Sequence, residues 1–352
     1  MTLSEIFRLF APEQPREYET IDSSRGEGDF RLAVIARWAP GVLPPELGDR
    51  MVIKLADNGF TDPERIRLWE RLSGEYRSRG YWCPRILGTL AGEYPRVEYE
   101  GHSCAVYGEE YASFQTADKF DPAPVFPDGR YTYLDDLLRM NGEIAAARFA
   151  FTDLPSAWCL FRVFDPADAE DEVMENAHEW LAEAEKLPAA YQPRVRRIWE
   201  RWRENRAYLE REYPHLPASV FQADLNSTNI LLDGEGRFAG LMDFNLAGRE
   251  VFLNYLFREV PFIFGRGEGS PEEAPEEAIL RRILYALGVV REVYPFCQAE
   301  RELALPLYRC LCPLWFTSVD QLRAAKTEAD FRRALEDVER AQTKEIDFGA
   351  YM

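Results

Sequence analysis

The sequence predicts an α+β fold with two lobes, a small β-rich amino-terminal lobe with one main helix and a larger, mostly helical carboxy-terminal lobe. The chain has 352 residues, which is enough for two domains or lobes. Short apolar segments between turns that contain glycine or proline occupy the first third. Amphipathic helical patterns dominate after residue 131. We therefore expect residues 1–108 to form the first lobe and residues 109–352 the second.

Composition excludes several classes of function. The chain carries 42 Lys and Arg against 61 Asp and Glu, for a net charge of −19. This acidity argues against a broad surface for nucleic acids or for anionic membranes. The sequence shows neither a signal peptide nor a run of about 18 apolar residues, so we expect no membrane span. None of the six cysteines forms C-x-x-C and the three histidines are scattered. We therefore expect reduced thiols in a cytoplasmic protein, with no zinc site. The oligomeric state has no signature.

The first third alternates strands with helices. Apolar residues at helical spacing predict a short amphipathic helix, namely Leu3, Ile6, Phe7 and Phe10. Strands are predicted at residues 17–22, 30–38 and 51–55. The main helix is predicted at residues 62–79, where Thr61 or Asp62 can cap the first turn and Pro63 fits it. Its apolar stripe consists of Ile66, Trp69, Leu72 and Tyr76.

After two further strand segments, near residues 84–88 and 103–111, the chain becomes helical. Amphipathic spacing predicts helices at residues 133–149, 169–187, 192–213, 276–294, 299–311 and 320–341. Glycines and acids at residues 264–271 predict a mobile loop.

The stretch of residues 221–247 carries the strongest functional signal. An apolar run, a glycine-containing turn and a second apolar run that leads into Asp243 predict a β-hairpin. A hairpin would bring Asp224 and Asn229 on one side near Asp243 on the other. Two carboxylates and an amide are costly to dehydrate unless something pairs with them. A hard cation such as Mg²⁺, held by one or two carboxylates and by phosphate oxygens, would satisfy that need.

The spacing within this hairpin resembles a known family. Asp224, four further residues and Asn229 match the D-x-x-x-x-N of a kinase catalytic loop. The pair Asp243-Phe244 stands where the metal-binding D-F of kinases follows its hairpin. The chain thus resembles the aminoglycoside phosphotransferase and choline kinase-like branch of the protein-kinase fold. That branch usually has His where this chain has Gln222, which can also donate and accept hydrogen bonds. The alternative is a polar hairpin with a capping aspartate and no ligand.

The resemblance implies roles for these side chains. Asp224 would orient the acceptor hydroxyl and accept its proton. Asn229 and Asp243 would hold Mg²⁺ ions that bridge and neutralise the phosphates of ATP. The donor would be ATP, with GTP as the alternative.

Further positions follow from the order of the family's elements along the chain. Lys54, in an otherwise apolar strand, resembles the V-A-I-K lysine that neutralises phosphates. A glutamate of the main helix would pair with it, and spacing favours Glu70 over Glu75. Ser24 and Gly26 lie in the glycine-containing segment that would cover the nucleotide.

The strand at residues 103–111 would run into the connection between the lobes. In the family, backbone groups of this connection read the adenine edge. Tyr107 and Glu109 are therefore expected to lie at the cofactor site.

The function implied is ATP-dependent transfer of a γ-phosphoryl group to a hydroxyl of a small molecule. The acidic chain would suit a cationic acceptor, although acidity also serves solubility. A second reading is a nucleotide-binding, pseudokinase-type regulatory module without transfer activity, motivated by Gln222 and by the altered residues 245–247. A protein kinase is disfavoured, because no A-P-E segment follows Asp243.

Overall fold

The computed structural model describes residues 1–26, 28–264 and 275–352. The chain divides into two compact units. Unit 1 comprises Met1–Pro122, Asp165–Ala167 and Asn226–Ala247, and unit 2 comprises Ala123–Phe164, Asp168–Leu225 and Gly248–Met352. The lobe boundary expected between residues 108 and 109 falls inside a strand that continues to Glu110. The first segment of unit 1 extends beyond that boundary, to Pro122.

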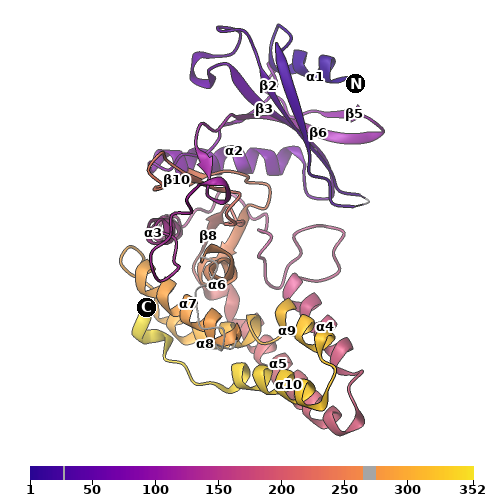
Figure 1. Ribbon diagram of the computed structural model, residues 1–352, viewed down its shortest axis with the longest axis vertical. Coiled ribbons are helices and arrows are strands. Elements are labelled where there is room, and N and C mark those ends of the chain that lie inside the picture. The colour runs from indigo at the N-terminus through magenta and orange to yellow at the C-terminus, as the bar shows by residue number, and fades with distance from the viewer. Residues whose placement is uncertain (27, 265–274) are drawn as a thin grey trace. The chain divides into compact units, whose positions relative to one another are not determined.

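Unit 1 is built on an antiparallel sheet in the order β1-β2-β3-β6-β4, with β5 also paired to β6 (Figure 1). Its strands are β1 (Glu17–Asp22), β2 (Phe30–Arg37), β3 (Arg50–Asp57), β4 (Ile86–Leu87), β5 (Arg96–Tyr99) and β6 (His102–Glu110). Strand residues alternate between the two faces of the sheet. Met51, Ile53 and Leu55 of β3 join the core cluster on the face covered by α1 (Leu3–Phe10). Lys54 therefore points to the other face.

The opposite face of the sheet meets α2 (Pro63–Ser78), where the Trp69 ring lies 5.6 Å from the Tyr107 ring. Asp62 caps this helix, because its carboxylate accepts hydrogen bonds from the Glu64 and Arg65 N–H groups at 2.7 and 3.0 Å. The apolar stripe expected from the sequence is buried, as predicted.

The hairpin expected at residues 221–247 is confirmed. It consists of β9 (Ile230–Leu232) and β10 (Phe238–Leu241), and β7 (Gln115–Thr116) pairs with β9. At Gly240 a Cβ would lie 1.7 Å from the Trp82 carbonyl oxygen, so no other residue fits there. Trp82 donates to the Ala239 carbonyl and accepts from the Leu241 N–H, both at 2.9 Å. The hairpin is thereby fixed to the segment that follows α2.

Unit 2 is mostly helical. Its helices are α3 (Leu134–Ala146), α4 (Glu172–Ala184), α5 (Gln192–Glu212), α6 (Phe252–Ile263), α7 (Pro275–Val290), α8 (Gln298–Leu311), α9 (Phe316–Ala324) and α10 (Glu328–Thr343). A two-stranded sheet joins β8 (Ala218–Phe221) to β11 (Gly248–Val251). Short 3-10 turns lie at Ala189–Tyr191, Tyr213–His215 and Phe348–Tyr351 in this unit, and at Pro45–Leu47 and Ala117–Lys119 in unit 1.

The end of the chain contains one more helix than the sequence predicts. The single helix predicted at residues 320–341 is two helices, because the Thr327 hydroxyl and the Asp330 carboxylate form a capping box that starts α10 anew. Most of the loop predicted at residues 264–271 lies outside the described residues. The α+β class itself is confirmed.

The helix α6 is the centre of unit 2. Every residue from Phe252 to Val260 is buried, including Arg258 and Glu259. A helix buried on all sides belongs to a core rather than to a surface. Among the described helices, none is long and apolar enough to cross a membrane.

Candidate active site

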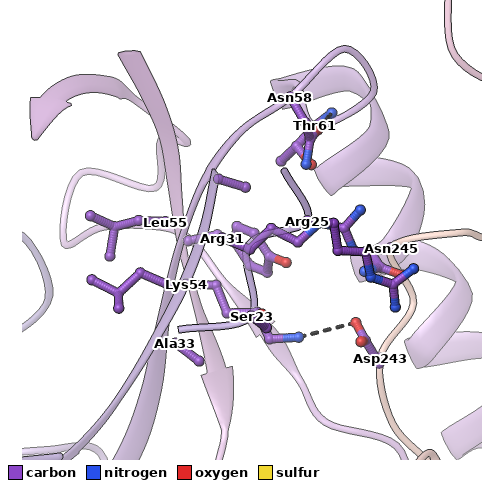
Figure 2. A pocket seen from close by; sticks show the side chains of 13 residues that line it. Ser23, Arg25, Arg31, Ala33, Lys54, Leu55, Asn58, Thr61, Asp243 and Asn245 are labelled. Atoms are coloured by element: carbon purple, nitrogen blue, oxygen red, sulfur yellow. Dashed lines mark hydrogen bonds and ion pairs between the residues drawn. The ribbon is translucent and has the colours of Figure 1, made fainter. Parts of the chain in front are cut away.

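Two adjoining cavities open beside Lys54 in unit 1, and both are lined by Lys54 and Ala33. The first, here called the polar cavity, has a volume of about 150 Å³ (Figure 2). Its polar lining includes Ser23, Arg25, Arg31, Lys54, Asp243 and Asn245. The second, here called the apolar cavity, has a volume of about 330 Å³. Its lining includes Ile35, Val52, Tyr111, Leu231 and Met242.

Lys54 is held between two carboxylates. Its Nζ lies 3.0 Å from Oε1 of Glu109 and 3.1 Å from Oδ1 of Asp243. Burial by itself would lower the pKa of Lys54, but the charges of Asp243 and Glu109 outweigh it and hold that pKa well above its usual value. Burial raises the pKa of Glu109, and the Lys54 ammonium opposes that rise. Lys54 is therefore a fixed cation at the junction of the two cavities.

The expected partner of Lys54 was wrong. Glu70 lies on the exposed face of α2, and its carboxylate accepts a hydrogen bond from the Tyr94 hydroxyl at 2.9 Å. Glu75, the second candidate, forms an ion pair with Arg79 at 3.0 Å. The α2 face that packs inward carries the apolar stripe instead, so neither glutamate points to the sheet. Glu109 takes the position, from the strand next to that of Lys54.

The hairpin of unit 1 places Asn229 close to the start of Asp243. The Met242 N–H donates to the Asn229 carbonyl at 2.9 Å, and Asn229 is buried. Asp243 has a left-handed backbone with φ of 57°, a conformation that is uncommon outside glycine. The next residue, Phe244, is anchored by an edge-on contact with the Tyr76 ring at 5.7 Å. The carboxylate of Asp243 is thus presented to the polar cavity by a fixed backbone.

The donor set at this position fits a hard divalent cation. Asn245 lines the same cavity as Asp243, and its Oδ1 atom is buried without a hydrogen-bond partner among the described residues. A carboxylate next to an unpaired amide oxygen is the kind of oxygen pair that Mg²⁺ prefers. The described residues contain no cluster of three or more His, Cys, Asp or Glu that could hold a metal. Phosphate oxygens would have to complete the coordination.

The glycine-containing loop between β1 and β2 presents different residues from those expected. The Ser24 hydroxyl accepts a hydrogen bond from the Arg31 N–H at 3.0 Å, and the Ser24 N–H donates to Asp22 at 2.9 Å. Gly26 supplies a left-handed turn, with φ of 75°. Ser24 and Gly26 therefore shape the loop, whereas Ser23 and Arg25 line the polar cavity.

Tyr107 and Glu109, the two residues expected at the cofactor site, each line one of the two cavities. Tyr107 lines the polar cavity and Glu109 the apolar cavity. Glu109 acts on Lys54 through its side chain, whereas the expectation concerned backbone groups of the connecting segment. Burial raises the pKa of Tyr107 far above its usual value, so this phenol stays neutral.

The loop that carries Asp224 belongs to unit 2. Gln222 is fully buried, and its Oε1 accepts from the Asp224 N–H at 2.8 Å. Its Nε2 donates to the Asp224 carbonyl at 3.2 Å. Ala223 between them has a left-handed backbone with φ of 62°. The Gln222 side chain thus both donates and accepts a hydrogen bond, as expected from its amide, and it holds the backbone of Asp224.

Glu259 on α6 also supports this loop, through a buried hydrogen bond. Its Oε2 accepts from the Leu225 N–H at 3.0 Å, and its Oε1 accepts from the Trp158 indole N–H at 2.7 Å. Burial raises the pKa of Glu259 to about 8; these hydrogen bonds lower it, and the charge of Asp224 adds to the rise. Sequence reasoning missed Glu259 and Trp158. The only signal for Glu259 was the charged pair Arg258-Glu259 within a mostly apolar helix.

Comparison with known proteins identifies the family. A sequence model described as the phosphotransferase enzyme family matches residues 45–253. No curated protein sequence matches the chain. Among solved structures, a microcompartment-associated aminopropanol kinase is similar at 14% identity and a TM-score of 0.53, over 97% of this chain and 94% of that one.

Two more solved structures show the same fold. An amicoumacin kinase in complex with AMP-PNP and Ca²⁺ has 14% identity and a TM-score of 0.52, over 99% of this chain and 96% of that one. An aminoglycoside phosphotransferase from Alicyclobacillus acidocaldarius has 12% identity and a TM-score of 0.50, over 98% and 92%. At these identities the likeness establishes the protein-kinase-like fold. Because the family match spans more than half of the chain, the protein belongs to the phosphotransferase enzyme family and is a phosphotransferase.

Proposed function

We propose that the enzyme transfers the γ-phosphoryl group of ATP to a hydroxyl of a small molecule, with Mg²⁺ as the metal. The observation that carries the proposal is Lys54, held by Glu109 and Asp243 where an apolar cavity adjoins a polar one. A purine base needs an apolar slot, and a phosphate chain needs cations beside it. The two cavities offer these environments on either side of one lysine.

The apolar cavity is the proposed site of the base. Its lining by Ile35, Val52, Leu231 and Met242 suits a flat ring between aliphatic side chains. Glu110 and Tyr111 of the connecting segment also line it, which supports recognition of the base by backbone groups there. This chemistry accepts adenine and leaves guanine as the alternative.

In the proposed mechanism, each side chain has one task. Lys54 neutralises the inner phosphates. Asn229 and Asp243, with the unpaired amide oxygen of Asn245, would hold Mg²⁺, which when bound screens the phosphate charge. Asp224 accepts the proton of the acceptor hydroxyl as its oxygen bonds to the γ-phosphorus. The bond between that phosphorus and the β–γ bridging oxygen breaks, and ADP leaves with the electron pair. Most of the acceleration comes from positioning and from electrostatic stabilisation.

The non-catalytic alternative loses its main motivation. It rested on Gln222 in place of histidine, yet the Gln222 side chain bonds both the N–H and the carbonyl of Asp224. A substituted residue that keeps the loop closed favours transfer activity.

The acceptor class is a further part of the proposal. The similar structures include kinases named for aminopropanol and amicoumacin and an aminoglycoside phosphotransferase. We therefore propose alcohols that also carry an amine as the first acceptors to screen, in keeping with the net charge of −19.

The six cysteines form no disulfide, which supports the cytoplasmic location expected from the sequence.

The thermal midpoint of unfolding with and without Mg-ATP tests the nucleotide site. A ligand at 100 times its dissociation constant adds about 2.7 kcal/mol, which raises the midpoint by a few degrees in a chain of this size. We expect that rise in the wild type and its loss in Asp243→Asn. The matched control is Glu235→Gln, at the exposed tip of the same hairpin. No rise with either ATP or GTP in the wild type would refute the nucleotide site.

A further inference from the structure

The polar cavity contains more positive charge than its lysine alone. Arg25 of the β1–β2 loop and Arg31 of β2 line it together with Asp243 and Asn245 (Figure 2). Arginine is the side chain best suited to phosphate, because its planar fork of N–H donors matches two phosphate oxygens. The two arginines differ in how they are already engaged.

Arg31 is committed within unit 1. Its Nε and one of its terminal nitrogens each lie 2.7 Å from a separate oxygen of Asp29. Asn58 donates to Asp29 at 3.2 Å, and the Arg31 guanidinium lies 5.1 Å from the centre of the Phe60 ring. Arg31 is therefore fixed in place, and the Asp29 carboxylate already balances its charge.

Arg25 is placed but not committed. Its backbone N–H donates to the Asp29 carbonyl at 2.9 Å, which closes the loop and sets the residue at the cavity. Its side chain is exposed. Across residues 1–26, 28–264 and 275–352 the structure records neither an ion pair nor a hydrogen bond for its guanidinium. Within the described residues, none of its side-chain N–H donors is engaged, and a ligand can bind them.

The charges around the polar cavity show what Arg25 adds. Lys54 and Arg31 provide two positive charges, and both are paired. Their three carboxylate partners are Asp29, Glu109 and Asp243. Without the Mg²⁺ that Asp243 is proposed to help hold, this set is net negative by one charge, which would repel a phosphate chain. Arg25 supplies the missing cation.

We propose that Arg25 binds the terminal phosphates of the nucleoside triphosphate and positions them for transfer. The inference rests on the proposed nucleotide site and names a binding residue that the motif of the catalytic loop does not include. Arg25 reaches the polar cavity from the loop, and Asp243 and Asn245 line the same cavity, so the phosphates would lie among these three side chains. Arg25 has no part in holding the base.

Nucleotides of different phosphate length test this assignment. Dissociation constants for AMP, ADP and AMP-PNP, with Mg²⁺ present, are measured by calorimetry for the wild type, Arg25→Ala and Arg25→Lys. We expect Arg25→Ala to weaken AMP-PNP and ADP binding about 10-fold or more while AMP changes less than about two-fold. Arg25→Lys keeps the charge without the fork, and we expect an intermediate loss.

The matched control is Arg8→Ala, which removes an exposed arginine of α1 outside both cavities. It should bind all three nucleotides as the wild type does. If Arg25→Ala keeps the wild-type ratio of AMP-PNP to AMP affinity, the role of Arg25 is refuted while the nucleotide site stands. If the wild type binds none of the three, the nucleotide site fails and the role of Arg25 fails with it.

Discussion

In unit 1 the candidate binding groups are held by opposite charges, whereas in unit 2 the backbone around Asp224 is held by buried hydrogen bonds. Lys54 sits between Glu109 and Asp243, an arrangement in which phosphate oxygens can replace one carboxylate. Asp224 is enclosed by the amide of Gln222, and the next N–H is bound by Glu259. Ion pairs can be exchanged for a charged ligand, but backbone hydrogen bonds to a buried side chain fix geometry. This difference agrees with the proposed function, in which unit 1 binds the nucleotide and unit 2 positions Asp224.

The largest expected effect comes from removing the carboxylate that unit 2 positions. Asp224→Ala should lower kcat by about 10²–10⁴-fold, because no other group would accept the proton of the acceptor. Mg-ATP affinity should change little, since the groups proposed to bind it lie in unit 1. Steady-state release of ADP and calorimetric binding of Mg-ATP measure the two quantities. Full activity in Asp224→Ala would remove this residue from the mechanism.

A smaller effect is expected from the ion pair of unit 1. Glu109→Gln removes the carboxylate charge on β6 that pairs with Lys54. We expect kcat/KM for ATP to fall about 10-fold or more in this variant. Glu70→Gln is the matched control, because Glu70 is exposed and contacts Tyr94 instead. That variant should change kcat/KM less than about two-fold. The reverse order of the two effects would restore Glu70 as the partner of Lys54.

The smallest effect concerns the pH dependence of stability in unit 2. Folding raises the pKa of Glu259 from 4.5 to about 8. Between these values the folded protein keeps a proton that the unfolded chain has released, so the free energy of unfolding falls as pH rises. The contribution to the free energy of unfolding is on the order of a few kcal/mol at most, and its loss is complete above about pH 8. Below about pH 4.5 both states are protonated and the contribution is fully present.

Glu259→Gln removes this titration. Denaturant unfolding at several pH values between about 5 and 8 should give a flatter profile for the variant than for the wild type. Gln can accept only through one oxygen, so the variant should also lose stability overall as one of the Trp158 and Leu225 N–H donors loses its acceptor. Parallel profiles in the two proteins would show that Glu259 is ionised throughout this range.

Local pattern was sufficient for the hairpin and for the lysine strand. The turn at residues 233–236, the apolar strands on either side and Lys54 within β3 all stand where the sequence predicts them. These features depend on neighbours within a few residues, and strand and turn preferences act at that range. The amphipathic stripe of α2 was predicted for the same reason.

The partners of the functional side chains could not be predicted in this way. Glu259 bonds residues 34 and 101 positions away, and no local pattern encodes such distances. The choice of Glu70 relied on the spacing usual in the family that the chain resembles, while the face that α2 buries is decided by packing on Tyr107. Nothing in the sequence around Arg25 distinguishes it from other exposed arginines, because its place at the polar cavity depends on the conformation of the β1–β2 loop.

Because Glu109 and Lys54 stand on neighbouring strands of one sheet, their spacing is set by the hydrogen-bond ladder. Val52 pairs with Glu109 and Lys54 with Tyr107 in that ladder. In protein kinases the corresponding glutamate is carried by a helix, and displacement of that helix switches the enzyme off. Here α2 can shift without separating the charges of the pair. A movement of α2 would leave the pair of Lys54 and Glu109 intact, and it would act instead on Arg77 of α2, whose guanidinium lies 2.9 Å from the Glu110 carboxylate.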